Sequence, residues 1–91
     1  MKALVIYPRQ FEETQVFDFP VDDFNTENMD VDSILDLIFR QCNHVDGNEW
    51  IEGKKLRSMS VGDMVKLTFD LGYLGERVDL FCCQNIGWKK L

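Results

Sequence analysis

The sequence predicts an α+β fold, in which a small antiparallel sheet of four to five strands packs one face against a single amphipathic helix. Three observations support this prediction. Short apolar runs rich in β-branched and aromatic residues occur toward both ends, one segment between them has helical periodicity, and turn-forming residues separate them. The chain has 91 residues, of which 45% are hydrophobic, so we expect one domain, residues 1–91, with a modest core.

Two strands are predicted near the N-terminus. Residues 2–7, KALVIY, form a short apolar run closed by a proline, which is typical of a buried strand. Residues 14–21 alternate two phenylalanines and a valine with other residues, so we expect a second strand that is antiparallel to the first. Pro20 cannot donate a ladder hydrogen bond and therefore marks a sheet edge or the end of this strand.

The clearest helix follows a polar stretch. Asp30 or Asp32 can cap it, because a short side-chain oxygen satisfies a free backbone N–H at a helix start. Acidic residues are also favoured at this positive end. We expect the helix to end near Asn43, with Gly47 in the left-handed conformation common at such exits. Its apolar face has the spacing i, i+3, i+4, i+7 and i+11 and consists of Val31, Ile34, Leu35, Ile38 and Cys42.

The C-terminal half is expected to supply a hairpin with a long loop. Residues 64–69 and 77–83 are apolar runs separated by a loop with two glycines. Residues 50–56 are ambiguous between a brief strand, which would be one more strand of the sheet, and a packed loop, and no element is assigned to residues 84–91. The order is therefore two strands, the helix, then two or three strands.

Residues 57–65, RSMSVGDMV, are expected to turn the chain into the first strand of this hairpin. The segment lacks the glycine and lysine spacing of a phosphate-binding P-loop, and turn residues beside a strand need no ligand. The start of a strand does not require a guanidinium group. We therefore expect Arg57 to pair with an acid such as Asp63 or Glu49.

The net charge of −6 is unevenly distributed. Residues 1–50 carry eleven acids and three bases, whereas residues 51–91 carry five acids and seven bases. The segment 12–36 contains nine acids and no base. Such a field disfavours nucleic acids and membranes and favours cationic partners. The acids of this segment are Glu12, Glu13, Asp18, Asp22, Asp23, Glu27, Asp30, Asp32 and Asp36.

Two interpretations of this acidic segment remain open. It is either a solvated face whose interleaved phenylalanines turn into the core, or a surface that docks on a basic protein. In the second case its carboxylates imitate phosphates and attract lysine and arginine clusters. The predicted partner-binding residues are Glu12, Glu13, Asp18, Asp22, Asp23, Glu27, Asp30 and Asp32.

The cysteines and the single histidine do not match a known site. The spacings C-x-H and C-C differ from the C-x₂₋₄-C pairs typical of zinc. Cys42 and His44 do not face each other on a helix, and either Cys82 or Cys83 must point inward. We therefore predict no catalytic residue, metal or cofactor. A cysteine-dependent enzyme that uses Cys82 or Cys83 is kept as an alternative.

Three strings resemble a family of small proteins from phages, plasmids and archaeal mobile elements. They are LIFRQCNHVDGNEWI at 37–51, KLRSMSVGDMV at 55–65 and CCQNIGW at 82–88, and they fit the pattern FRxxNxVDGxEW, RSMSVGDxV, GW. The resemblance implies a mobile-element setting and no catalytic residues. In that family the hairpin that contains residues 68–78 is tighter, and the acidic half lies outside the pattern.

These observations predict a small acidic binding protein of a phage or mobile element. We expect it to inhibit or modulate a host protein with a basic surface by stoichiometric docking, for example a nucleic-acid-handling or defence complex such as a CRISPR or restriction system. The alternative is a structural or scaffolding protein that self-associates through a sheet edge. The odd cysteine count and the lack of a targeting segment predict the host cytoplasm. The lack of a long apolar run predicts no membrane contact. We expect a monomer or small homo-oligomer.

Overall fold

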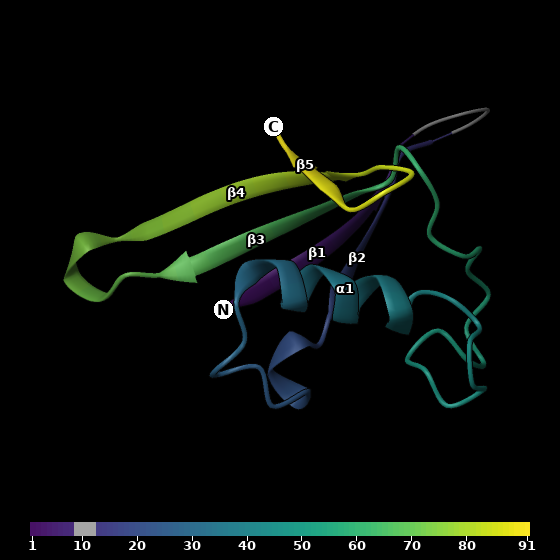
Figure 1. The fold of residues 1–91 in the computed structure, drawn as a ribbon. Coiled ribbons are helices and arrows are strands. Elements are labelled where there is room, and N and C mark those ends of the chain that lie inside the picture. Colours follow the sequence, from purple (N-terminus) through teal and green to yellow (C-terminus); the bar gives the residue numbers. More distant parts are fainter. Residues whose placement is uncertain (9–12) are drawn as a thin grey trace.

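The computed structural model describes residues 1–8 and 13–91 and contains a five-stranded antiparallel sheet with one α-helix against it (Figure 1). The predicted α+β fold is confirmed. The elements are β1 (Lys2–Tyr7), β2 (Gln15–Phe19), η1 (Val21–Asp23), α1 (Val31–Gln41), β3 (Met64–Asp70), η2 (Gly72–Leu74), β4 (Glu76–Cys83) and β5 (Trp88–Lys90).

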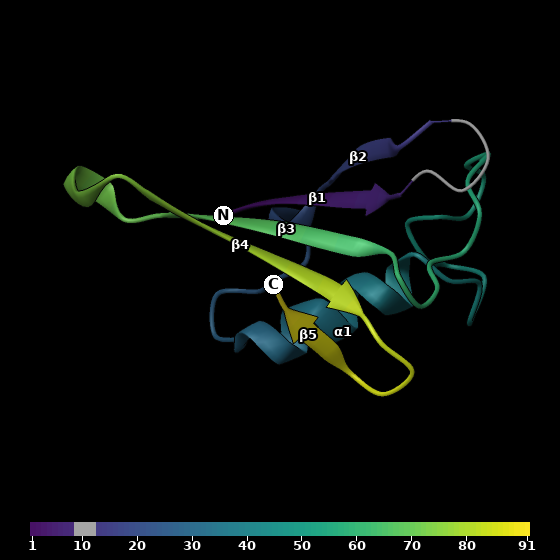
Figure 2. The same ribbon diagram turned by 90° about the horizontal axis from the view of Figure 1, so that it is seen from above.

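The strand order is β2-β1-β3-β4-β5, and every neighbouring pair is antiparallel (Figure 2). Ala3 lies opposite Phe19 on one side and Leu67 on the other. The N-terminal strand therefore lies inside the sheet, beside a strand that starts more than fifty residues later. This order brings Asp22, in the middle of the acidic segment, close to the β3–β4 hairpin.

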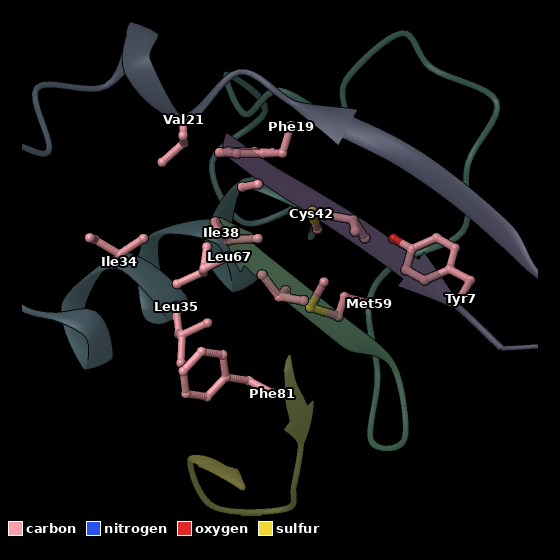
Figure 3. Packing of buried hydrophobic residues seen from close by; sticks show 13 residues of the cluster. Tyr7, Phe19, Val21, Ile34, Leu35, Ile38, Cys42, Met59, Leu67 and Phe81 are labelled. Carbon is pink, nitrogen blue, oxygen red and sulfur yellow. The ribbon is translucent and has the colours of Figure 1, made fainter. Parts of the chain in front are cut away.

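The core lies between α1 and the sheet face that it covers (Figure 3). Val5 and Val65 pair across the centre of the sheet and are fully buried. Leu35 and Ile38 from α1 are fully buried against this face, and Cys42 continues the same stripe at the helix end. The predicted apolar face of the helix is thus the one that packs.

The start of α1 matches the sequence prediction, and the helix ends at Gln41, two residues before the expected Asn43. Asp30 is the N-cap, and its carboxylate accepts a hydrogen bond of 2.8 Å from the Ser33 N–H. Gly47, in the exit, has a φ of 86°. Pro20 directly follows β2, which is an edge strand, so the predicted role of this proline also holds.

Residues 50–56 form turns without a strand, which decides between the two alternatives in favour of a packed loop. The loop is tied to the end of α1, since the Ile51 N–H donates to the Gln41 carbonyl at 3.0 Å. The Met59 N–H donates to the Cys42 carbonyl at 3.1 Å, and the Met59 side chain is buried in the core.

The opposite face of the sheet, which we call the open face, is covered by no helix among the described residues (Figure 1). Strand alternation and the register place apolar side chains there between three lysines and Asp18. The apolar side chains of the open face are Leu4, Ile6, Val16, Met64, Val78, Leu80 and Cys82.

Candidate functional site

The acidic segment is held in place by apolar side chains that alternate with exposed carboxylates. Val21 is buried, so Asp22 and Asp23 in the same 3-10 turn point outward. Phe24 stacks on Phe19 with ring centroids 5.4 Å apart. These contacts turn the aromatic residues toward the core and leave the acids on the surface, as both interpretations of the segment require.

Five of the predicted acids gather around the start of α1, and we call them the acidic surface. They come from η1, the following loop and the first turn of α1, which lie on one side of the molecule (Figure 1). Every one of the five is exposed. The acidic surface consists of Asp22, Asp23, Glu27, Asp30 and Asp32.

Few cations face the acidic surface. Within residues 1–8 and 13–91, the only ion pair of these five acids joins Asp22 to the N-terminal amine of Met1, at 4.0 Å. Asp30 is engaged as the helix cap, and hydrogen bonding by Ser33 lowers the pKa of its carboxyl below the ordinary value. Asp32 lies in the first turn, where the helix dipole favours a negative charge. For Asp23 and Glu27, no ion pair, helix cap or helix dipole among the described residues compensates the negative charge.

The acids elsewhere in the chain differ, because six of the seven outside segment 12–36 have a partner. Four contact a cationic or histidine side chain, and two accept backbone N–H groups. These six are Asp46, Glu49, Glu52, Asp63, Asp70 and Asp79. The excess negative charge is therefore local to the segment and is not a general property of the surface.

The structure does not bring all the predicted acids together. Glu13 precedes β2 and lies at the opposite end of that strand from η1, roughly 17 Å away by the rise of five extended residues. Asp18 projects from β2 onto the open face, opposite Leu4, but it also lines a second open hollow together with Asp22 and Asp23, so it borders the acidic surface. Glu12 lies outside the described residues. The predicted surface is thus narrower than the segment that suggested it.

A hollow that the sequence did not reveal extends the acidic surface toward the β3–β4 hairpin. It is open, has a volume of about 400 Å³, and is lined by Asp22, Asp70 and Glu76 together with the N-terminal residues Met1 and Lys2. Asp70 and Glu76 are opposite each other in the hairpin register. Their pairing was predictable from the hairpin, but their closeness to Asp22 depends on the strand order.

Two of the three thiols, those of Cys42 and Cys83, are buried, which is unfavourable for a nucleophile, whereas Cys82 is half-buried on the open face. Burial raises the pKa of the Cys42 thiol to about 12, and burial also raises the pKa of Cys83. A nucleophilic cysteine instead needs a lowered pKa. The His44 Nδ1 lies 2.5 Å from the Glu52 carboxylate. Within the described part of the chain, no three histidine, cysteine or acidic residues are arranged to hold a metal ion.

Arg57 pairs with Asp63, one of the two partners expected for it. Its guanidinium donates two hydrogen bonds of 2.6 and 2.7 Å to the buried Asp63 carboxylate and lies 4.1 Å from the centre of the Tyr7 ring. The Tyr7 hydroxyl donates to the Arg57 carbonyl at 3.0 Å. A salt bridge therefore joins the first residue of segment 57–65 to a residue near its end.

Comparison of the chain with models of protein families, with curated proteins and with solved structures finds no match. No helix within residues 1–8 and 13–91 combines the length and apolar character needed to cross a membrane.

Proposed function

We propose that this chain is a small acidic binding protein of a phage or other mobile element, which docks its acidic surface on a basic host protein and so inhibits or modulates that protein. The observation that supports the proposal is the contrast between the nearly unpaired carboxylates around the start of α1 and the partnered acids elsewhere. A nucleic-acid-handling or defence complex is a suitable target class, because such proteins present lysine and arginine clusters to phosphates.

Folding stability explains Asp30 as the helix cap and Asp32 beside the helix dipole, but it gives no reason for Asp23 and Glu27 to add like charges beside them. A surface that serves only solubility mixes both signs, whereas clustered carboxylates repel one another. Clustered carboxylates do, however, steer a basic partner into contact and fix its orientation. The association should therefore weaken as salt rises, since screening shortens the reach of the charges.

The proposal is tested with two variants of equal net charge. Asp23→Lys/Glu27→Lys reverses the two acids of the acidic surface that have no structural partner among the described residues. Glu13→Lys/Asp46→Lys reverses two acids that lie apart from it, one before β2 and one in the loop after the C-terminal end of α1. Each reversal adds two charges, so both variants change the net charge from −6 to −2. Host proteins retained at low salt are identified, purified and titrated with each variant.

We expect the first variant to bind at least about 10-fold more weakly, because two attractive contacts become repulsive, and the second to bind nearly as the wild type does. The partner's own activity should fall to its minimum at one equivalent of wild-type protein. Equal binding by all three proteins would refute docking through the acidic surface. Equal weakening by both variants would attribute binding to net charge alone.

Self-association is a second candidate, and the open face supports it better than a sheet edge does. The β2 edge carries Asp18 and ends at Pro20, and the β5 edge is only three residues long, so both edges are poorly suited to pairing. The open face instead presents Val16 and Val78, each about half exposed. A dimer in sedimentation that is insensitive to salt and is disrupted by Val78→Lys would favour this candidate over docking on a host protein.

A further inference from the structure

The β3–β4 hairpin extends beyond the rest of the sheet. β3 pairs with β4 over seven positions, out to Asp70 opposite Glu76, whereas its pairing with β1 stops at Thr68. Figures 1 and 2 show the hairpin projecting past the other strands, with η2 at its tip. The tip therefore has no neighbouring strand on either side and is presented to the surroundings.

The tip carries large apolar side chains that the fold does not use. Tyr73 is 99% exposed, Leu74 is 73% exposed, and Leu71 beside them is 42% exposed. A turn at this place requires Gly75, whose φ of 92° and ψ of −142° suit only glycine, but it does not require a tyrosine or a leucine. Small polar residues would serve the turn as well. Exposed clusters of this kind mark interaction sites.

The tip is also prearranged. The Leu71 N–H donates to the Gly75 carbonyl at 2.8 Å, and the Gly72 N–H donates to the Asp70 carboxylate at 2.8 Å. In the stem, the Arg77 guanidinium lies 4.5 Å from the centre of the Phe69 ring. These contacts fix the backbone of the tip, so less backbone entropy is lost on association, and tyrosine is among the residues most often dominant in interfaces.

We propose that Tyr73 and Leu74 form an anchor that inserts into an apolar pocket bordered by lysine or arginine on a protein partner. The cationic border is inferred from Asp70 and Glu76 at the base of the tip, which with Asp22 give the hollow there three carboxylates against the amines of Met1 and Lys2. These carboxylates and the net charge of −6 disfavour an anionic membrane as the occupant. The inference deepens the proposed function and rests on it, since one partner would contact both the tip and the acidic surface.

The first test uses a photoreactive benzoylphenylalanine in place of Tyr73 or, as a matched control, in place of Ile86. Ile86 lies between β4 and β5 and is 93% exposed, so it equals the tip in accessibility. After illumination in host lysate, we expect position 73 to crosslink to one protein, at an apolar pocket flanked by basic residues, and position 86 to give no specific product. Excess wild-type protein should suppress the crosslink.

Absence of a crosslink at position 73 would overturn the inference, as would equal crosslinking at both positions. A product with lipid or with a second copy of this chain would also overturn it, because the occupant would then be a membrane or the protein itself.

The second test compares affinities for the partner so identified. Tyr73→Ala/Leu74→Ala should weaken binding at least about 30-fold at both low and high salt, the loss typical of interface anchors, and Ile86→Ala should change it less than about 3-fold. Unchanged circular dichroism would show that the fold is intact. If the tip variant binds normally while Asp23→Lys/Glu27→Lys does not, the anchor alone is refuted. If instead Asp23→Lys/Glu27→Lys binds normally while the tip variant does not, docking through the acidic surface is refuted and the anchor is retained.

Discussion

Asp63 accepts the hydrogen bonds that hold segment 57–65 together. Its side chain is buried, accepts two hydrogen bonds from Arg57, and accepts a third from the Ser60 N–H at 2.8 Å. A buried carboxylate is tolerated only when it is paired and hydrogen-bonded, and here both conditions hold. The same acid raises the pKa of Cys42, after burial itself, so it also keeps that thiol protonated.

Asp63→Ala should therefore lower the free energy of unfolding by about 2–3 kcal/mol, because the partly exposed Arg57 and the Ser60 N–H lose their acceptor. Urea denaturation monitored by tryptophan fluorescence measures the change. Glu76→Ala is the control, since Glu76 is exposed and has no ion pair among the described residues, and it should change stability by less than about 0.5 kcal/mol. Similar effects of both substitutions would contradict a structural role for the Arg57–Asp63 pair.

Glu49 shows a different use of a carboxylate, as the cap of a turn. Its side chain accepts backbone N–H groups from Asp46 at 2.6 Å and from Gly47 at 2.9 Å. The hydrogen bond from Asp46 is the main cause that lowers the pKa of Glu49 below the ordinary value. A carboxyl whose pKa is lowered by folding stabilises the fold above its unfolded pKa and loses that contribution as the pH falls.

Glu49→Gln should therefore be less stable than the wild type at neutral pH, and the difference should vanish as the solution is acidified through the lowered pKa of Glu49. Urea denaturation of both proteins between about pH 7 and pH 2 measures this, the ordinary glutamate pKa being about 4.3. A difference in stability that stays constant with pH would show that the ionised form of Glu49 is not the one that stabilises the turn.

Among the elements, α1 is the one whose start and buried face follow most directly from its own sequence. Its start is fixed by a cap that the sequence displays, and its buried stripe follows the 3.6-residue period. Adjacent positions on the helix therefore have opposite roles. Ile38 is fully buried in the core, whereas Phe39 is 39% exposed.

Ile38→Ala should lower the free energy of unfolding by about 3 kcal/mol, because it leaves a cavity in the centre of the core, whereas Phe39→Ala should lower it by about 1 kcal/mol or less. Chemical denaturation of the two variants compares a small buried side chain with a larger exposed one. A greater loss for Phe39→Ala would mean that the helix packs through a different face.

The loop between α1 and β3 could be predicted only in part. Turn residues identified its exit at Gly47 and its end at Asp63, but residues 50–56 had no periodicity that separates a strand from a packed loop. What holds this loop are backbone hydrogen bonds to Gln41 and Cys42 at the end of α1. Such contacts join segments that the sequence does not show to be neighbours.

For the whole molecule, the distribution of charge has a consequence for stability. The acidic surface places like charges close together with little compensation among the described residues, so it should destabilise the fold slightly. Stability and function often oppose each other at a binding site. Neutralising the charges of such a site then stabilises the protein but weakens its function.

Asp23→Asn/Glu27→Gln should thus raise the free energy of unfolding by up to about 1 kcal/mol at low ionic strength, with the gain shrinking in high salt as repulsion is screened. Thermal unfolding at two salt concentrations measures both effects. Glu13→Gln/Asp46→Asn makes the same change in net charge away from the acidic surface and should give a smaller gain. A loss of stability in the first variant would assign these two acids a structural role.

The sequence by itself determined the class of fold, the extent of the main elements and the charge asymmetry. Those properties are local, since cap residues, the period of apolar side chains and prolines act over a few neighbouring positions. Strand alternation also required that either Cys82 or Cys83 point inward, but the structure was needed to choose Cys83, as it was to choose Asp63 over Glu49 as the partner of Arg57.

Only the tertiary structure decided the strand order β2-β1-β3-β4-β5, and with it the shape of the candidate site. That order places the turn after β2 beside the hairpin, so Asp22 shares a hollow with Asp70 and Glu76, and it leaves Glu13 apart at the other end of β2. The reason is physical: strand order is selected by how distant apolar faces bury one another against α1, and no short stretch of sequence contains that information.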